Sequence, residues 1–156
     1  MRKTDLSEMP CPVARSLDIV GEWWTLVIVR DAFRGARRFE EFRAVGIADN
    51  ILSARLKRLV DEGIFERVPY QEHPARFEYL LTEKGRELAI VLAALATWGK
   101  RWTDGPDLSR ISHGDLSHGV TMQAYCEECA RPINPEEIRV QRLRPSSVGA
   151  GTAAQP

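Results

Sequence analysis

The stretch Arg37–Thr82, RRFEEFRAVGIADNILSARLKRLVDEGIFERVPYQEHPARFEYLLT, decides the fold of this chain. Its first half holds two short helical patterns separated by a turn that contains Gly46. Its second half holds two runs rich in aromatic and branched residues around a polar tip, which predicts a β-hairpin. This order is typical of a winged helix-turn-helix, a mainly α (α+β) fold with a two-stranded wing.

Within this stretch, the spacing of apolar residues predicts helices over residues 39–45 and 49–62. Asp49 is expected to cap the second of them, because aspartate is favoured at helix N-caps. The strands of the wing are expected over residues 64–70 and 77–81.

Two further helices are predicted ahead of this stretch, over residues 12–20 and 23–34. Pro12 is favoured at the first position of a helix, which makes Cys11 the N-cap. The second helix is apolar almost all round, so we expect it to be the central buried helix.

A long helix is predicted after the wing, from its cap at Thr82 to about Thr103. A domain of this size cannot bury the whole apolar stripe of such a helix, so a second copy of the chain is expected to cover it. The stripe consists of Leu88, Val91, Leu92, Leu95, Trp98 and Trp102.

Composition and the positions of glycine and proline divide the chain of 156 residues into four parts. We expect a flexible lead (residues 1–10), a DNA-binding and dimerisation domain (11–107), a small Cys/His-containing extension (108–144) and a disordered tail (145–156). No run approaches the roughly 18 apolar residues that a membrane span needs, and the N-terminal region lacks the apolar segment of a secretory signal. A cytoplasmic protein without membrane partners is expected.

The overall charge excludes a strongly basic nucleic-acid coat protein, because 22 Lys and Arg balance 22 Asp and Glu. A sequence-specific binder needs only a local positive field. Residues 34–58 contain seven basic and three acidic residues, which is such a local excess.

The helix over residues 49–62 has an apolar side and a polar side when its residues are placed at 100° intervals. Leu52, Leu56 and Leu59 lie within about 60° of one another, which defines the side that faces the core. The opposite side carries Asn50, Ala54 and Lys57, with Ser53 and Arg58 flanking them.

These polar residues suit a helix that reads DNA. Asn50 can bond adenine with two hydrogen bonds, Ser53 reads bases loosely, and Ala54 permits close approach or packs on a thymine methyl. Lys57 and Arg58 suit phosphates. The alternative is an ordinary solvated helix face, which the preceding turn and the following hairpin make less favoured.

Basic residues also flank this helix on both sides. Arg37 and Arg38 precede the short helix, at the place where a helix-turn-helix meets backbone phosphates. His73 and Arg76 lie at the tip of the hairpin and are candidate groove or phosphate contacts. Simple solvation is the alternative for each of them.

Motifs in order and at matching spacings make residues 11–103 resemble the HxlR-type transcriptional regulators, which are related to the MarR group. They are Cys11-Pro12, Gly21-Glu22-Trp23-Trp24, Arg37-Arg38-Phe39, Phe42, Ile47, Leu52-Ser53-x-Arg55-Leu56-x-x-Leu59, Gly63, Pro74-x-Arg76-x-x-Tyr79-x-Leu81-Thr82-x-x-Gly85 and Trp98.

The resemblance implies a homodimeric repressor or activator that binds near-palindromic operators in double-stranded DNA. It also implies a dimer interface built from the first and last helices. The chain departs from the pattern at Glu22, where lysine is common in the family.

Cys11 is a candidate redox sensor. An N-cap thiol faces the positive end of a helix dipole, which favours the reactive thiolate. In several HxlR-type regulators a cysteine at the matching position senses oxidants or electrophiles. A half-buried structural cysteine is the alternative.

The extension holds His113, His118, Cys126 and Cys129, a set that could bind one zinc ion. One alternative is a metal-free remnant that folds as a short hairpin, such as residues 123–125 against 138–140. Another is a reversible disulfide between the two cysteines.

Four tryptophans lie on the helices expected at the dimer seam. They are either part of an aromatic core or the wall of a pocket for a small planar aromatic effector. They are Trp23, Trp24, Trp98 and Trp102.

Enzyme activity is not expected. The chain has no Ser/His/Asp set, no Gly-rich phosphate loop and no HExxH motif. A redox enzyme that uses Cys126 and Cys129 lacks the strand-to-helix context of thioredoxin-like chemistry. A winged helix that serves only protein interaction is a further alternative.

Overall fold

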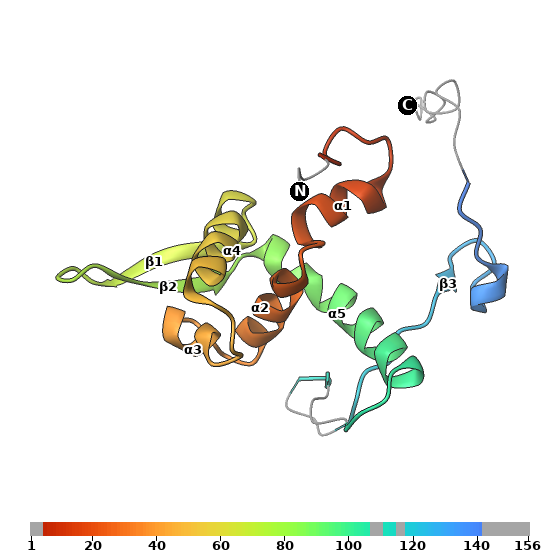
Figure 1. The fold of residues 1–156 in the computed structure, drawn as a ribbon. Helices are drawn as coiled ribbons and strands as arrows, with labels where there is room; N and C mark the ends of the chain where they lie inside the picture. Colours follow the sequence, from red (N-terminus) through yellow and green to blue (C-terminus); the bar gives the residue numbers. More distant parts are fainter. Residues whose placement is uncertain (1–4, 107–110, 115–117, 142–156) are drawn as a thin grey trace, which may run out of the picture. The chain divides into compact units, whose positions relative to one another are not determined.

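The predicted order of helices and strands is present in the structure, a computed structural model that describes residues 5–106, 111–114 and 118–141 (Figure 1). Contacts divide the chain into two units, residues 1–121 and 122–156. The first unit begins with α1 (Pro12–Val20) and α2 (Trp23–Phe33), close to their predicted limits. Cys11 is the N-cap of α1, as predicted, and its side chain forms no capping hydrogen bond.

The stretch that decides the fold is a winged helix-turn-helix. Its elements follow in the order α3 (Phe39–Arg43), α4 (Asp49–Asp61), β1 (Phe65–Gln71) and β2 (Arg76–Leu81). The two strands are antiparallel, with Phe65 opposite Leu81, and the hairpin projects beyond the helices (Figure 1).

The predicted cap of α4 is wrong by one residue. Ala48 is the N-cap, and Asp49 is already the first helical residue. The carboxylate of Asp49 pairs with the guanidinium of Arg43 at 3.0 Å, so it binds a side chain of the preceding helix instead of the backbone of its own helix.

The core of the first unit lies between α2, α4 and the base of the wing. Leu52, Leu56 and Leu59 of α4 are fully buried, as their phasing predicts. Burial of a leucine side chain contributes about 1.5–3 kcal/mol, so this stripe determines which side of α4 faces inward.

An aromatic cluster joins α3 to both strands of the wing. The ring of Phe42 lies 6.0 Å from that of Phe65 and 6.4 Å from that of Tyr79. Pairs at this separation and tilt contribute beyond their burial. The short helix α3 is therefore attached to the wing through side chains that lie far apart in the sequence.

The prediction that α2 is the central buried helix holds for the middle of the helix but not for its ends. Ile28 and Val29 are completely buried, but the side chain of Trp23 is 90% exposed and Phe33 is also exposed. The reason is that α2 packs against several neighbouring helices through its middle, so its ends extend beyond the core.

The long helix α5 (Glu83–Trp102) begins at the predicted cap. The hydroxyl of Thr82 accepts a hydrogen bond from the backbone N–H of Gly85 at 3.1 Å and donates to the carbonyl oxygen of Gly63 at 2.6 Å. A Cβ atom at Gly85 would lie 2.3 Å from the carbonyl oxygen of Ile64, so only glycine permits this close packing of α5 on the chain that enters β1.

The chain ahead of α1 is hydrogen-bonded to that helix over part of the predicted lead. The backbone N–H of Leu6 donates to the carboxylate of Asp18 at 3.3 Å, and Arg15 donates to the carbonyl oxygen of Met9 at 2.9 Å. No helix of the described residues is long and apolar enough to cross a membrane.

The second unit contains a small hairpin. Strands β3 (Tyr125–Cys126) and β4 (Arg131–Pro132) are antiparallel, and the short 3₁₀ helix η1 (Pro135–Glu137) follows them. The pairing of residues 123–125 with 138–140 is therefore wrong, because the chain reverses at once after Cys126. The predicted tail, residues 145–156, lies outside the described residues.

A carboxylate caps the start of α3. Glu41 accepts hydrogen bonds from the backbone N–H groups of Arg37 at 2.6 Å and Arg38 at 2.9 Å. These two bonds, with the nearby guanidinium groups, lower the pKa of the Glu41 carboxyl below its usual value. The ionised form is therefore favoured in the folded chain.

We predict that Glu41→Gln destabilises the chain at neutral pH but not in acid. A lowered folded-state pKa contributes stability above the pKa of the unfolded chain, about 4.3 for glutamate. That contribution is lost as the pH falls through the folded-state pKa. Chemical denaturation at a series of pH values from neutral to acid, at one protein concentration, measures this. The unfolding free energies of Glu41→Gln and of the unsubstituted chain should converge as the pH falls.

The matched control is Glu40→Gln, because the carboxylate of Glu40 pairs only with exposed Arg43 among the described contacts. Its difference from the unsubstituted chain should be smaller. A constant gap between Glu41→Gln and the unsubstituted chain at every pH would contradict the role given to the charge of Glu41.

Candidate nucleic-acid interface

The outer side of α4 is open to solvent over its first two turns. Asn50, Ser53 and Ala54 are exposed, and Asn50 forms no side-chain hydrogen bond with the rest of the described chain. The Ser53 hydroxyl donates to the carbonyl oxygen of Asp49 at 2.8 Å, and Lys57 pairs with Asp61 one turn on. The predicted groove-facing residues therefore lie on one accessible surface, while their contacts with DNA stay a prediction.

Arg58 lies in a different environment from these residues. Its guanidinium donates to the carbonyl oxygen of Asp18 at 2.9 Å and to the carboxylate of the same residue at 2.8 Å. A further pair with Glu62 has a separation of 3.4 Å. Arg58 thus connects α4 to α1, and it is the least suited of the predicted phosphate contacts because its charge is already used inside the unit.

The unusual Glu22 has a partner on α4. Its carboxylate accepts a hydrogen bond from Arg55 at 2.9 Å, and both side chains are half-buried. An acidic residue at this position therefore ties the start of α2 to the middle of α4. The structure accounts for this departure through an intramolecular ion pair.

The segment before α3 runs beside the wing. The backbone N–H of Tyr79 donates to the carbonyl oxygen of Arg37 at 2.7 Å. The guanidinium of Arg38 bonds the carboxylate of Glu78 at 2.9 Å and lies 4.3 Å from the centre of the Tyr70 ring. The bond to Glu78 raises the pKa of Arg38.

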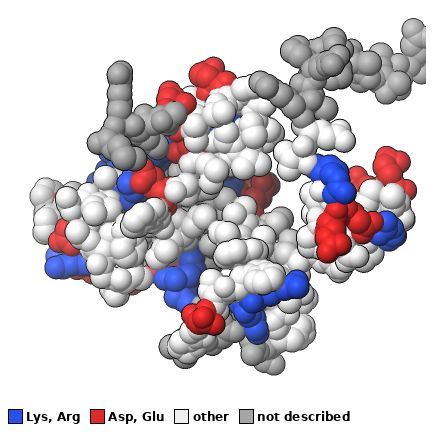
Figure 2. Space-filling model, turned by 45° about the vertical axis from the view of Figure 1, so that its right-hand side comes forward, with Lys and Arg blue, Asp and Glu red and all other residues white. Residues whose placement is uncertain are grey.

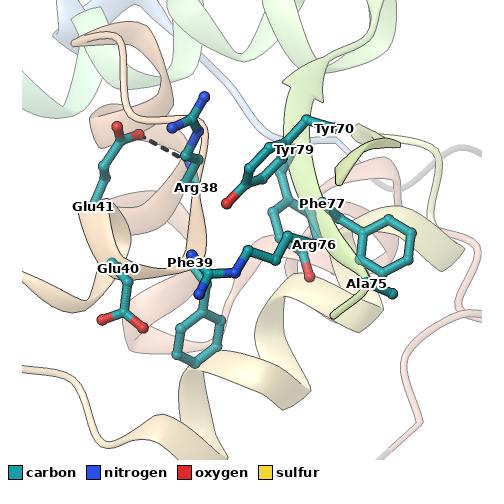
Figure 3. Close-up of a pocket in the computed structure, with 9 residues that line it drawn as sticks. All are labelled: Arg38, Phe39, Glu40, Glu41, Tyr70, Ala75, Arg76, Phe77 and Tyr79. Carbon is teal, nitrogen blue, oxygen red and sulfur yellow. Dashed lines mark hydrogen bonds between the residues drawn. The ribbon is translucent and has the colours of Figure 1, made fainter. Parts of the chain in front are cut away.

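A cleft of ≈ 660 Å³ separates α3 from the wing (Figure 3). In Figure 3 the side chain of Arg76 extends from β2 toward Phe39 and Glu40, and Tyr79 points into the same space. The lining residues are Arg38, Phe39, Glu40, Glu41, Tyr70, Ala75, Arg76, Phe77 and Tyr79. The cleft brings the two predicted basic flanks, the start of α3 and the wing, to one surface.

Three arginines of this region, Arg37, Arg67 and Arg76, form no hydrogen bond or ion pair through their guanidinium groups with another described residue. Arg37 still lies near enough to Glu41 for its charge to help lower the pKa of that carboxyl. Arg67 lies over the ring of Phe77, 3.4 Å from its centre, a contact that leaves its N–H groups free. The sequence prediction counted basic residues only over residues 34–58, so it did not include Arg67. The position of Arg67 on a predicted strand of the wing could have indicated it as a candidate.

The wing tip also carries His73, which is exposed and accepts a hydrogen bond at its carbonyl oxygen from Gln71 at 3.0 Å. Its imidazole has no contact that distinguishes a DNA role from solvation. On the face drawn in Figure 2, basic and acidic residues form small interleaved clusters, so no single-signed field covers that face. The positive charge of Arg37, Arg67 and Arg76 is consequently confined to the region around the wing.

The four tryptophans do not share one environment. Trp24 is half-buried against the core, whereas Trp98 is 61% and Trp102 64% exposed. The cleft described above contains none of them. The effector pocket therefore stays a prediction. Cys11 is a half-buried thiol at the start of α1, and its sensing role also stays a prediction.

The predicted zinc ligands form two pairs. The rings of His113 and His118 have centres 5.9 Å apart in the first unit, and Cys126 and Cys129 lie in the second unit. No three His, Cys, Asp or Glu side chains of the described residues come together as a metal site. Zinc binding by the four residues stays a prediction.

Comparison with known proteins identifies the family. The HxlR-like helix-turn-helix family matches residues 19–107. Rv3095 of Mycobacterium tuberculosis (strain ATCC 25618 / H37Rv), named as an HTH-type transcriptional regulator, is 41% identical over 130 residues, which are 81% of this chain and 82% of that protein.

Solved structures agree with this match. PA1607, described as a proposed transcription factor, has a TM-score of 0.77 and 41% identity, and the likeness covers 89% of this chain and 99% of that one. The redox regulator HypR in its reduced form has a TM-score of 0.54 and 33% identity, over 60% of this chain and 95% of its own. The chain belongs to the HxlR-like helix-turn-helix family of transcriptional regulators.

Proposed function

We propose that the chain binds a near-palindromic DNA operator as a homodimer and regulates transcription from it. The observation that carries this proposal is the exposed polar side of α4, on a unit whose α3 start and wing carry three arginines without an ion pair to another described residue. A helix in this setting fits the major groove, while a projecting hairpin fits the backbone or the minor groove beside it.

In this proposal the two ends of α4 have different roles. Asn50, Ser53 and Ala54 lie in the first two turns, where a recognition helix contacts base edges. A free amide such as that of Asn50 can bond adenine with both of its polar atoms. Lys57 lies one turn further and contacts phosphate, after giving up its weak surface pair with Asp61.

The arginines of the cleft and the wing supply the phosphate contacts. Arg37, Arg67 and Arg76 need not break an ion pair to bind DNA, so their full charge is available. Arg38 differs from them, because its bond to Glu78 and its contact with Tyr70 hold it in place. Its role is to position the start of α3 against the wing, with one side of its guanidinium left for phosphate.

The homodimer is supported by the apolar surface of α5. This helix of 20 residues is about 30 Å long, and every exposed side chain between Ile90 and Trp98 is apolar. Leu95 is 49% exposed, and Trp98 and Trp102 are exposed further. Val13 and Leu17 of α1 are also exposed, so both helices that the family resemblance assigns to the interface present apolar side chains.

A response to oxidants is the further part of the proposal. HypR is a redox regulator of similar fold, and Cys11 of this chain is a thiol at the N-terminus of α1 with no capping hydrogen bond. Because α1 is expected at the dimer interface, oxidation of Cys11 would change how the two copies meet. The spacing of the two α4 helices would then change, and the affinity for the operator would change with it.

We predict that Asn50→Ala and Arg76→Ala weaken operator binding in different ways. Loss of a base contact at Asn50 should cost about 1–3 kcal/mol and relax the preference at one base position. Loss of a phosphate contact at Arg76 should weaken all sequences alike and reduce the salt slope by about one. Fluorescence anisotropy over a salt series, on an operator selected from random DNA, measures both.

The control for charge is Arg139→Ala, which removes one exposed arginine from the second unit. It should leave affinity and salt slope unchanged. Dimerisation without salt-sensitive DNA binding in the unsubstituted chain would instead support a winged helix used only for protein interaction.

We predict that Leu95→Lys converts the dimer to a monomer. A lysine in the apolar stripe of α5 places two charges in one interface, because each copy contributes the same surface. Sedimentation velocity should show the change, and operator affinity should fall because a monomer holds one half-site only. Val140→Lys, at an exposed valine of the second unit, is the matched control and should stay dimeric.

We predict that Cys11→Ser removes oxidant-dependent release from the operator. Hydrogen peroxide at low excess should lower the affinity of the unsubstituted chain, with recovery after dithiothreitol. The serine variant should bind equally well before and after treatment. Release that persists in Cys11→Ser would show that this thiol is not the sensor.

A further inference from the structure

Two ion pairs join α4 to the corner between α1 and α2. Arg58 of α4 donates to the carboxylate of Asp18 at 2.8 Å. Arg55, one turn before it, donates to the carboxylate of Glu22 at 2.9 Å. The two acidic residues lie on either side of Gly21, the C-cap of α1. We call these two pairs the clasp.

Arg58 also caps the C-terminal end of α1. Its Nη2 atom, which bonds the carboxylate of Asp18, donates to the backbone carbonyl oxygen of the same residue at 2.9 Å. The last carbonyl groups of a helix have no partner within that helix, and the helix dipole favours a cation beside them. Arg58 is therefore bound to both the main chain and the side chain of one residue of α1.

Few other contacts hold α1 against the first unit. Of its nine residues Val20 alone is buried, and Ile19 packs against the core while partly exposed. The side chain of Asp18 is only 13% exposed, and its carboxylate also accepts a hydrogen bond from the backbone N–H of Leu6 at 3.3 Å. The direction in which α1 projects consequently depends on the contacts of its last turn.

The closed clasp leaves two donors unsatisfied. The Nε atoms of Arg55 and Arg58 are buried and have no hydrogen-bond partner among the described residues. A buried donor without a partner loses the bond that it would form with water. An arginine that leaves the clasp regains that bond, which makes the closed arrangement easier to open than its ion pairs alone suggest.

The two arginines differ in their distance from the proposed DNA-reading side. At 100° per residue, Arg58 lies about 80° from Asn50 around the axis of α4, whereas Arg55 lies about 140° away. The side chain of Arg58 is already 32% exposed. Once released, Arg58 can turn toward a phosphate beside the groove, while Arg55 faces away from it.

We propose that Asp18 is a positioning residue for DNA reading, because it fixes α4 against α1 and withholds the charge of Arg58 from DNA. This role rests on the proposed binding of an operator by a homodimer. With α1 at the dimer interface, the clasp of each copy sets the separation at which the two α4 helices meet their half-sites. An open clasp makes that separation less defined and gives each copy one more phosphate contact.

The main test is Asp18→Asn. Its amide has one acceptor oxygen in place of two and no charge, so it cannot bond both Leu6 and Arg58 as the carboxylate does. Operator binding should depend more steeply on salt, by about one counterion for each bound copy. The preference for the native half-site separation over one longer by a base pair should fall about threefold or more. Fluorescence anisotropy on the two operators over a salt series measures both.

Two variants separate these effects from a simple change of charge. Arg58→Ala opens the clasp without delivering a charge, so it should lose the same spacing preference with no steeper salt dependence. Added to Asp18→Asn, it should abolish the steepening. Glu62→Gln is the matched control, because the carboxylate of Glu62 also pairs with Arg58, at 3.4 Å, but within α4. It should change neither quantity.

Hydrogen exchange without DNA tests the holding role separately. The backbone amides of α1 should exchange faster in Asp18→Asn and in Arg58→Ala than in the unsubstituted chain or in Glu62→Gln. If Asp18→Asn does not fold, Glu22→Gln opens the second pair alone. It should weaken the spacing preference with an unchanged salt slope, since Arg55 faces away from the groove.

Several results would overturn the proposal. They are unchanged exchange of α1 in Asp18→Asn, an unchanged salt slope in that variant, or a steepening that persists after Arg58→Ala is added. An unchanged spacing preference in both Arg58→Ala and Glu22→Gln would also overturn it. Absence of operator binding by the unsubstituted chain would instead contradict the proposed function, whereas the exchange of α1 would still report whether the clasp holds that helix.

Discussion

The burial of the leucine stripe of α4 is the interaction on which the rest of this structure depends. Leu52, Leu56 and Leu59 face α2 and the base of the wing. Rotating the helix about its axis away from this orientation would expose at least one of them. Since a helix has a fixed period, the stripe also determines that Asn50 and Ala54 face solvent. The surface proposed to read DNA is therefore a consequence of core packing on the opposite side of the same helix.

A second constraint holds the wing against the helix-turn-helix. The backbone bond from Tyr79 to Arg37, the ion pair of Arg38 with Glu78 and the contact of Tyr79 with the Phe42 ring all cross from β2 to the region of α3. They combine a backbone bond, a charge pair and an aromatic contact at one junction. The arginines of the wing and those before α3 are thereby presented as one surface, although about 40 residues separate them in the sequence.

Sequence patterns predicted the structure correctly where residues close together in the sequence determine it. The limits of α1 and α5, the Thr82 cap and the phase of α4 depend on helical period and capping chemistry. Sequence pattern is insufficient where a distant partner decides. It could not show that Asp18 on α1 binds Arg58, whose phosphate contact stays a prediction, or that Trp23 at the start of the central helix α2 extends beyond the core. The hairpin of the second unit was misplaced because its strands have two residues each, too few for a periodic signal.

The sequence by itself determined the winged helix-turn-helix, the inward side of α4 and the presence of paired cysteines in the C-terminal region, because period, caps and spacing are properties of neighbouring residues. Only the tertiary structure decided which charged side chains remain available. Arg58 and Arg55 are bound to acidic partners on or beside other helices, whereas Arg67 and Arg76 are not. The physical reason is that an ion pair forms between groups that folding brings within reach, and no local pattern records which distant groups will meet.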